Sequence, residues 1–490
     1  MARRELIRIP TPREDEPEHV ALLLHGCSIN DALQHAVSTR DQREDAGLGD
    51  TEEGQHLLYP ASPTLDPAVL DSPLSSAPTS PEMPPSHPLL ASQPYSLPSP
   101  MDVPSLLLNQ PPSTSTKTRN HKQRTKAAKA AEKRAATRPS TYKIRSSLSR
   151  KYQKNRTVVL EDFKMMTLKT AAVGAWIARR CEIRTRFQTL EKVLEEGLDL
   201  VEWDGITTGV ICDDDRNICA VLEGIPGPQE AWREVRVEAT RAVAEAGGSL
   251  RFGNRRDRRG PFKTIAVGVS YGGGQKRPGI LRHSKHNQAV LHRLMTNPAV
   301  KRIAGFASSG FAFFAPKMYR DYATKLDALF EHYKELGYNW NNSIFPAASF
   351  NFGPNSASYE HNDHGNRAAG WCSIYCDGSF DPKYGGHLIL REFGIVVQFP
   401  PGATVLIPSA CIRHGNIPVR KGETRWSFAQ YASGGLFRYV EYGFKSWASL
   451  SDKDQDMWAQ RRAARWVEEL GLLSRVDDLA TDQGTAGLLV

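Results

Sequence analysis

Prolines are concentrated in one part of this 490-residue chain, and their position limits what the chain can fold into. Residues 57–112 hold 15 of the 32 prolines, set among Ser, Leu and Thr without a period that would bury a continuous face. A segment of this composition buries too little apolar surface to offset the conformational entropy that folding removes. We therefore expect residues 1–116 to form a disordered Pro/Ser-rich region that precedes the folded part.

The net charge of +9 is distributed unevenly along the chain. Residues 117–156 carry 15 Lys and Arg side chains against one acidic residue, Glu132, for a charge of +14. Residues 1–116 carry −10, which leaves +5 on residues 157–490. Because clustered Lys and Arg side chains attract polyanions, we interpret residues 117–156 as a basic arm that contacts phosphate groups and directs the protein to the nucleus. A solvated linker is the alternative interpretation.

Cysteine usage and hydropathy set the expected compartment. The seven cysteines form no paired C-x-x-C framework, which favours a reducing compartment over a disulfide scaffold. The apolar run at residues 20–28 is far too short to cross a bilayer. It also follows an acidic segment, whereas the apolar run of a signal peptide follows a basic one. We expect neither a signal peptide nor a membrane partner.

From about residue 157 the sequence has the mixture of apolar and polar residues that is typical of a globular domain. Apolar positions recur at helical spacing over residues 160–200, which predicts a helical cover at the start of the domain. Residues 209–227 predict two short strands around the turn "DDDRN". Helices are expected at residues 228–248 and 318–336.

Beyond the second of these helices the chain is strand-like to about residue 445. Helices followed by a run of short strands predict an α+β fold whose β part is a closed double sheet. We therefore expect a double-stranded β-helix, of the jelly-roll or cupin-like type, with flanking helices. This domain is expected to span residues 157–447, and residues 448–490 to form a C-terminal helix and tail.

Three side chains in this β region have the pattern of a metal site. His361 and Asp363 are two positions apart before the strand-like "GWCSIYC", so on a strand both would point to the same side. His414 follows about fifty residues later, a gap that accommodates several strands of the same sheet. Two histidines and one carboxylate are the ligand set of non-haem Fe(II) oxygenases. We predict that His361, Asp363 and His414 bind the metal.

Arg425 and Ser427 share a predicted strand face shortly after His414. A guanidinium group holds a carboxylate through two hydrogen bonds, and an oxygenase that uses 2-oxoglutarate needs such an anchor for the far carboxylate of this cosubstrate. We predict that Arg425 and Ser427 bind 2-oxoglutarate, and that Arg420 is the next candidate for the anchoring arginine. In the alternative interpretation, His414 is a hydrogen-bonded core histidine and Arg425 is the partner of an acidic side chain.

Other side chains in this region were weighed for the same roles. His364 would face away from His361 on a regular strand, and His387 lacks an arginine and serine at the comparable offset, so both are expected to be structural. Four aromatic residues are candidates to stack on a substrate ring, with a place in the core as the alternative: Phe352, Tyr359, Trp371 and Tyr375.

Residues 200–447 resemble the Fe(II)/2-oxoglutarate oxygenases of the TET/JBP type, in particular their fungal, often transposon-associated, representatives. The resemblance rests on the order of the blocks "YGGGQKRPG", "RIAGFASSGFAFFAPKMYRDY", "FPAASFNFGPNS", "HND", "GWCSIYCDGSFDPKYGGHLIL", "FPPGATVLIPSACIRHGN" and "GETRWSFAQYASGGLFRYVEYGF". It implies that His361, Asp363 and His414 bind iron, that Arg425 binds 2-oxoglutarate, and that O2 is the second cosubstrate.

Members of this type oxidise the methyl group of thymine or 5-methylcytosine in DNA, so the resemblance implies a DNA dioxygenase. The Arg-rich segment at residues 251–260 matches no base-reading pattern. Two alternatives stay open: a protein or small-molecule hydroxylase with the same residues, and a non-catalytic nucleic-acid-binding protein. The second would be expected to lack a ligand, whereas His361, Asp363, His414 and Arg425 are all present.

Overall fold

The computed structural model describes most of the chain after residue 137, and all of the described residues belong to one compact unit. The described ranges are 7–8, 138–152, 155–170, 174–183, 185–253, 257–272 and 275–489. The region expected to be disordered lies outside the described residues, apart from the short strand β1 (Ile7–Arg8). The first part of the basic arm, residues 117–137, lies outside them as well.

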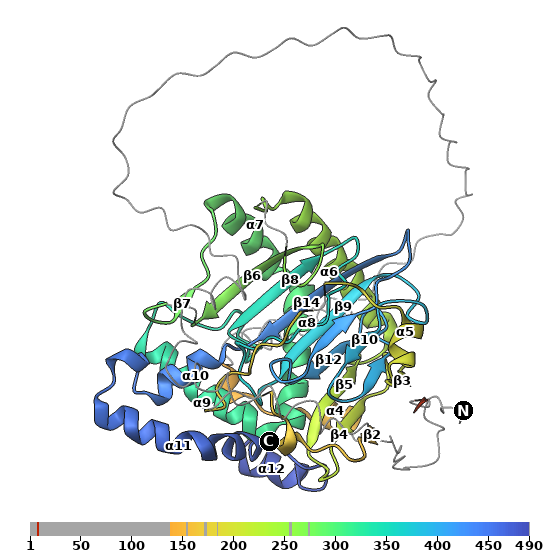
Figure 1. Cartoon of the computed structure of the whole chain (residues 1–490). Coiled ribbons are helices and arrows are strands. Elements are labelled where there is room, and N and C mark those ends of the chain that lie inside the picture. The colour runs from red at the N-terminus through yellow and green to blue at the C-terminus, as the bar shows by residue number, and fades with distance from the viewer. Residues whose placement is uncertain are drawn as a thin grey trace, which may run out of the picture. The chain divides into compact units, whose positions relative to one another are not determined.

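Helices and two β-sheets make up the fold, so the predicted α+β class is confirmed (Figure 1). Short runs of β-branched and aromatic residues supply the strands of the larger sheet, which has nine strands. Their spatial order is β2 (Arg156–Val159), β4 (Gly209–Cys212), β5 (Ile218–Gly224), β12 (Thr404–Ile407), β9 (Cys372–Ser379), β14 (Thr424–Tyr431), β8 (Ala347–Phe352), β6 (Lys263–Ser270) and β7 (Gly279–Ile280).

The smaller sheet has five strands, in the order β1, β3 (Asp199–Glu202), β11 (Ile395–Val397), β10 (Leu388–Leu390) and β13 (His414–Asn416). Strands β2 and β7 end the larger sheet, and β1 and β13 end the smaller one. No strand pairing between the named strands of the described residues joins the two sheets, so the closed double sheet expected from the sequence is not found.

The two sheets share an apolar core. Leu390 of β10 and Val397 of β11 belong to the same buried cluster as Val405 of β12, which lies in the larger sheet. The intervening residues Ile389 and Val396 face the opposite way and pack with α5 (Leu190–Glu195). This alternation follows from the period of two along a strand, and it places the core between the sheets.

Helices cover the larger sheet on the side of a second apolar cluster. Trp232 and Leu291 pack there against Phe350 of β8 and Phe428 of β14. The helices of this layer are α6 (Gln229–Ser249), α7 (Lys285–Thr296) and α8 (Pro298–Phe314), and α9 (Pro316–His332) follows directly.

Several local predictions are confirmed. Strands β4 and β5 form the expected hairpin around the turn "DDDRN", and α6 and α9 lie where the helical periodicity placed them. Strand-like sequence does not continue to residue 445, however, because α10 (Gly434–Glu441) follows β14 directly. Its backbone is tied to the segment after Asp363, since the Gly434 N–H donates to the Gly365 carbonyl oxygen.

The predicted helical cover over residues 160–200 is wrong for most of its length. Only η3 (Met165–Thr167) and α5 are helical in the described part of this stretch. Its backbone groups bond to distant segments: the Leu160 N–H donates to the Cys212 carbonyl, and the Ala178 N–H donates to the His364 carbonyl. Local periodicity cannot report such long-range pairing, which here replaces the hydrogen bonds of a helix.

The folded unit also includes residues that were expected in the basic arm. Helix α4 (Ser146–Tyr152) and the turn η2 (Pro139–Thr141) precede β2, and Ile144 and Tyr152 are buried in the core. The Tyr152 hydroxyl donates to Glu223 at 2.6 Å. The packed structure therefore begins before residue 157.

The C-terminal residues pack onto the same unit (Figure 1). Arg367, four positions after Asp363, is 1% exposed and bonds through Nε and Nη2 to both carboxylate oxygens of Glu469, each at 2.8 Å. This ion pair joins the loop after Asp363 to the C-terminal helices, which are η4 (Trp447–Ser449), α11 (Asp452–Leu470) and α12 (Leu479–Thr485). Within the described residues, every helix is too short or too polar to span a membrane.

Candidate metal centre

His361 and His414 come together through a short antiparallel pairing of two segments. His361 forms an isolated bridge with His414, the first residue of β13, with N–H to oxygen distances of 3.0 and 2.8 Å. Residues directly opposite each other on antiparallel segments project to the same face. The two imidazole ring centres accordingly lie 4.5 Å apart.

Asp363 completes the cluster from the turn that follows His361. Its carboxylate oxygens lie 3.6 Å from the His361 Nε2 atom and 3.8 Å from the His414 Nε2 atom. One ligand atom from each of the three residues lies within 4.8 Å of the others. Among the residues that the structure describes, no other three His, Cys, Asp or Glu side chains form such a group.

Asn362 lies between the two ligands in sequence and points away from the cluster. Its side-chain amide donates to the carbonyl oxygens of Arg179 and Ala410 and accepts a hydrogen bond from the Cys181 N–H. The alternation predicted for a strand thus persists in an irregular segment, because Asn362 is held on the far side by these three bonds.

Both histidines are oriented as metal ligands. The Nδ1 atom of His361 lies 2.7 Å from the Tyr359 carbonyl oxygen, and that of His414 lies 2.9 Å from the Ile412 carbonyl oxygen. A carbonyl oxygen only accepts, so each Nδ1 carries the proton and each Nε2 lone pair faces the cluster. Burial, together with the neighbouring His414, lowers the pKa of His361 well below its ordinary value, which keeps this ring neutral.

The Asp363 carboxylate is ionised although it is enclosed. Burial raises its pKa, but the positive charges around it, that of Arg259 first, outweigh burial and hold the pKa below its ordinary value. The Oδ1 atom is buried without a hydrogen bond, and its nearest charged partner is Arg259 Nη1 at 3.5 Å. A buried anionic oxygen is costly unless a cation or donor compensates it, so two imidazole nitrogens and this carboxylate fit a divalent metal.

Arg425 is buried on β14 without an acidic partner. It is 1% exposed, and its Nη1 atom donates to the Ser356 carbonyl oxygen at 3.0 Å. Its Nε and Nη2 atoms make no hydrogen bond to an oxygen or nitrogen atom, and among the described residues the ionisable group that acts on its charge is the Cys376 thiol and not an acidic side chain. Burial lowers the pKa of Arg425. Two adjacent unused donors on one guanidinium group fit the two oxygens of a carboxylate.

The neighbours of Arg425 do not compete for this role. Ser427 is buried on the same face of β14, where its hydroxyl accepts a hydrogen bond from Asn351 at 2.9 Å. Arg420, the alternative anchor, is 52% exposed and paired with Glu423 at 2.7 Å.

His364 and His387 do not belong to the triad that the structure brings together. Burial lowers the pKa of each to about 4, with Arg258 and Arg180 contributing for His364. Three of the four candidate stacking residues lie in the core. Phe352 packs on Phe252, Trp371 packs on Phe311, and Tyr375 donates to Asp377.

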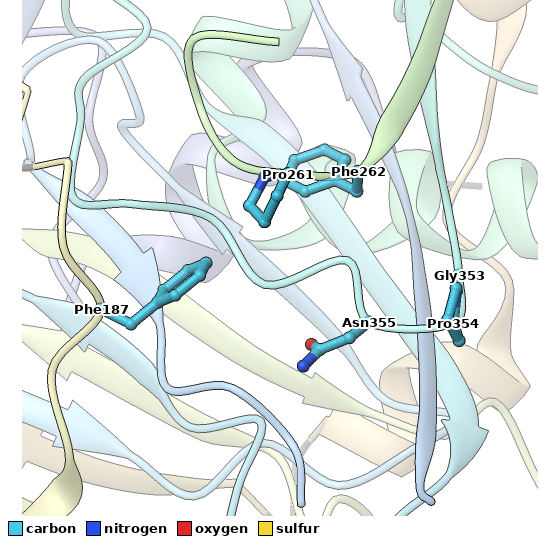
Figure 2. Close-up of a pocket in the computed structure, with 6 residues that line it drawn as sticks. All are labelled: Phe187, Pro261, Phe262, Gly353, Pro354 and Asn355. Carbon is cyan, nitrogen blue, oxygen red and sulfur yellow. The ribbon is translucent and has the colours of Figure 1, made fainter. Parts of the chain in front are cut away.

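Tyr359, the fourth candidate, lies beside a cavity of about 150 Å³. Its ring centre is 4.6 Å from that of Phe187, which lines the cavity. In Figure 2, the Phe187 ring and the Asn355 side-chain amide point into the same space, with Pro261 and Phe262 across from them. Sequence analysis missed these lining residues, because they come from segments that only tertiary structure brings together. The full lining is Phe187, Pro261, Phe262, Gly353, Pro354 and Asn355.

Comparisons with known proteins give limited information. No protein-family profile matches the chain, and no curated protein matches it. One solved structure to which the chain is similar is described as NgTET1 in complex with 5mC DNA. The likeness has a TM-score of 0.34 at 15% identity and covers 50% of this chain and 87% of that one.

Proposed function

We propose that this protein is an Fe(II)- and 2-oxoglutarate-dependent dioxygenase. The observation that carries the proposal is the combination of His361, Asp363 and His414 in one cluster with a buried arginine, Arg425, that has two unused donors and no acidic partner. A structural histidine cluster needs no such arginine. The alternative in which Arg425 pairs with an acidic side chain has no support among the described residues, none of whose acidic groups acts on its charge.

The roles of the residues follow from their chemistry. His361, Asp363 and His414 would hold the iron through two imidazole nitrogens and one carboxylate oxygen. Bound iron supplies the activation of O2 that lets a C–H bond be oxidised while 2-oxoglutarate is converted to succinate. Arg425 holds the far carboxylate of 2-oxoglutarate, and its burial excludes water that would compete for the same donors.

The proposed fold is a double-stranded β-helix of the TET/JBP type, in its fungal, transposon-associated-like form. The pairing of His361 with His414 and the core shared by the two sheets support this proposal. So does the order of the sequence blocks between residues 200 and 447.

The proposed substrate is a methyl group on a DNA base, either 5-methylcytosine or thymine. The resemblance of the sequence blocks supports a base substrate, and the +14 charge of residues 117–156 supports contact with a polyanion. A base in duplex DNA has to leave the stack to reach an enclosed centre, at a cost of a few kcal/mol. Nuclear localisation is proposed on the same charge pattern.

Two other functions use the same scaffold. A protein or small-molecule hydroxylase would need the same metal ligands and the same arginine, and only its substrate pocket would differ. A non-catalytic nucleic-acid-binding protein is disfavoured, because it would have no use for two unpaired donors on a fully buried arginine.

The test is succinate release by the purified full-length protein with Fe(II), O2 and 2-oxoglutarate. It is run with methylated duplex DNA, with methylated single-stranded DNA and without DNA, and the DNA bases are analysed by mass spectrometry. Succinate production stimulated by DNA, with one added oxygen atom on the methyl group, is expected. Succinate production that no DNA stimulates would shift the assignment to a protein or small-molecule hydroxylase, and no production at all would overturn the dioxygenase assignment.

A further inference from the structure

One part of the folded chain carries an unbalanced positive charge. Residues 258–320 include 12 Lys and Arg side chains and no Asp or Glu, although the average composition would place about seven acidic residues there. Residues 157–490 as a whole carry only +5, so acidic groups elsewhere offset this segment. It forms β6, β7, α7, α8 and the first residues of α9. The excess positive charge therefore lies on these consecutive elements.

Helix α7 directs this charge to solvent. Val290, Leu291 and Leu294 are buried in the apolar cluster between the helices and the larger sheet. Lys285 and Arg293 are exposed, and their positions in the helical period place them on the opposite side of α7. In Figure 1, α7 lies at the outside of the fold. Its charged side is therefore open to a partner.

Two neighbouring segments extend the charged surface. The Arg251 N–H donates to the Asn287 side-chain oxygen, and the Arg251 carbonyl accepts from the Asn287 amide, each at 2.9 Å. These bonds hold the exposed Arg251 beside the first turn of α7. Further charges are exposed in the first turns of α8, which begins after one intervening residue. We call the following five residues the basic face: Arg251, Lys285, Arg293, Lys301 and Arg302.

The basic face does not stabilise the helix that carries it. Helix α7 has no acidic residue in its first turn and begins instead with Lys285 and His286. The backbone dipole makes the start of a helix partially positive, so a cation there is unfavourable. Side chains that weaken local structure are expected where a function requires them.

Acidic side chains of neighbouring elements are engaged with other partners. Glu238 of α6 accepts a hydrogen bond from Asn297, the N-cap residue of α8, at 2.7 Å and pairs with Arg241 at 2.9 Å. Glu335, which follows α9, pairs with Arg277 at 3.1 Å. Neither carboxylate is paired with a member of the basic face in these contacts.

The helices around α7 cover the face of the larger sheet that is opposite to Arg425. Trp426 and Phe428 of β14 belong to the apolar cluster under these helices. Successive side chains on a strand point to opposite faces, so Arg425 points away from the helices. The basic face is therefore separated by the sheet from the candidate anchor for 2-oxoglutarate.

We propose that the basic face binds the phosphate backbone of duplex DNA, apart from the candidate metal centre. Lys285 and Arg293 are eight residues apart on one helix, or about 12 Å along its axis, which spans about three to four base-pair steps. The helix holds them at a fixed spacing, and a duplex offers phosphates at regular intervals. Backbone contacts carry no sequence information, so this binding is independent of base sequence and methylation. The inference goes beyond the proposed function and does not depend on the reaction.

Other polyanions fit the surface less well. A helix that binds a lipid surface inserts large apolar side chains, which α7 buries in the core instead. A flexible single strand is held by aromatic side chains that stack on its bases, and the exposed side of α7 has no Phe, Tyr or Trp. Its remaining exposed side chains are His286, Gln288, Ala289, His292 and Thr296.

The test is equilibrium binding of a labelled, unmethylated duplex to the full-length protein without iron or 2-oxoglutarate, across a salt series. One variant combines Lys285→Gln, Arg293→Gln and Lys301→Gln and so removes three charges from the basic face. The control variant removes three exposed charges outside residues 258–320, so both variants lose the same net charge. It combines Lys334→Gln, Lys421→Gln and Lys453→Gln.

Each lost phosphate contact lowers the slope of log affinity against log salt by about 0.9 on duplex DNA. We therefore expect the basic-face variant to lose about 2.7 from the slope and to bind at least about tenfold more weakly at 0.1 M salt. The control variant should keep the wild-type slope. Thermal unfolding checks that the fold is retained. The basic-face variant should unfold at the wild-type temperature or slightly above it, because a cation is removed from the start of α7.

Equal slopes for the two variants would overturn the inference. Unchanged affinity for the duplex, together with weaker binding to vesicles of anionic lipid or to single-stranded RNA, would overturn it as well, because the partner would then be a different polyanion. None of these measurements needs turnover. Failure of the proposed function would appear as absent succinate with the difference in slope intact, whereas failure of this inference would appear as equal slopes with succinate release intact.

Discussion

His361 and His414 lie directly opposite each other although about fifty residues separate them in sequence, with reciprocal backbone hydrogen bonds of 3.0 and 2.8 Å. The pairing fixes the spacing of the two imidazoles before any metal binds, because each ring is also held at Nδ1 by a backbone carbonyl. Only Asp363, on the turn that follows, has to supply the negative charge. The candidate centre is therefore largely preorganised.

Asp363→Asn keeps the shape of the side chain and removes its charge. Loss of a residue that only hydrogen-bonds to a metal ligand lowers metal affinity roughly 10- to 100-fold. Because Asp363 is itself a proposed ligand, we expect the affinity for a divalent metal to fall by more than that. Stability of the metal-free protein should also fall, because the lowered pKa of Asp363 means that its charge, beside Arg259, stabilises the folded state. Calorimetric titration with Mn(II) and thermal unfolding measure the two effects.

The matched control is Asp257→Asn, which changes a carboxylate that accepts a hydrogen bond from the Arg259 N–H and lies outside the triad. It should leave metal affinity unchanged. Equal loss of affinity in both variants would mean that general electrostatics, and not ligation by Asp363, accounts for metal binding.

Arg425→Lys keeps the positive charge but loses the planar pair of donors. We expect the concentration of 2-oxoglutarate needed for half-maximal succinate release to rise about 10- to 100-fold, which corresponds to roughly 1.5–3 kcal/mol for charged hydrogen bonds. Metal affinity should stay the same, because Arg425 is not among the ligands. Arg420→Lys, in the exposed pair with Glu423, is the control. A higher 2-oxoglutarate requirement in this variant, with none in Arg425→Lys, would assign the carboxylate anchor to Arg420 instead.

Glu223 gives the folded protein a pH dependence that is independent of the metal centre. It is fully buried, and burial raises its pKa to about 8 from an ordinary value of 4.5. The folded state thus holds this proton more tightly than the unfolded state does. The stability contributed by the group is complete below about pH 4.5 and is lost as the pH rises towards 8.

The side chain of the Glu223→Gln variant cannot titrate. The free energy of unfolding of this variant, relative to that of the wild type, should therefore rise by on the order of 3 kcal/mol between about pH 5 and 7.5. Lys151, whose pKa burial lowers to about 8, affects stability only above this range. Urea unfolding at several pH values measures the difference. A constant difference across the range, as expected for the exposed control Glu245→Gln, would contradict the assignment.

Truncation tests where the folded unit begins. Within the described structure, removing residues 1–137 takes away only the two-residue edge strand β1, so we expect a small change in the free energy of unfolding. Removing residues 1–156 deletes the buried Ile144 and Tyr152 and the first residue of strand β2, and each large apolar side chain contributes about 1.5–3 kcal/mol. The longer truncation should therefore unfold at a much lower temperature. Equal unfolding temperatures would show that the N-terminal packing is dispensable.

Arg367 tests the link between the loop after Asp363 and the C-terminal helix. Arg367→Met leaves Glu469 in place while one of its buried partners is lost, and breaking a buried ion pair costs about 3–5 kcal/mol. Arg461→Met, in an exposed pair with Glu468 on the same helix, should cost no more than about 1 kcal/mol. Similar costs for the two variants, measured by urea unfolding, would argue against a structural role for the buried pair.

Much of the site was predictable from sequence because its signals are local. The spacing of His361 and Asp363, and of Arg425 and Ser427, uses the period of two that any extended segment has. The same holds for the hairpin of β4 and β5, where the turn residues lie between two apolar runs. Such features depend on neighbours along the chain, so no knowledge of the fold was needed.

Other features had no local signal. Residues 160–200 have helical periodicity, yet Leu160 and Ala178 bond to strands and loops far along the chain, so tertiary hydrogen bonds decided their conformation. Trp371 and Tyr375 have the composition of stacking residues and lie in the core. Aromatic side chains serve both purposes, and only burial distinguishes them.

The sequence by itself determined which residues are candidates for the proposed chemistry, because the identity and spacing of His361, Asp363, His414 and Arg425 match a metal-ligand set and a carboxylate anchor. Only the tertiary structure decided what surrounds them. It brought the segments that carry Arg180 and Arg259 to the centre, and it left Arg425 buried without an acid. Contacts between segments so distant in sequence depend on the packing of the whole unit, which no local pattern encodes.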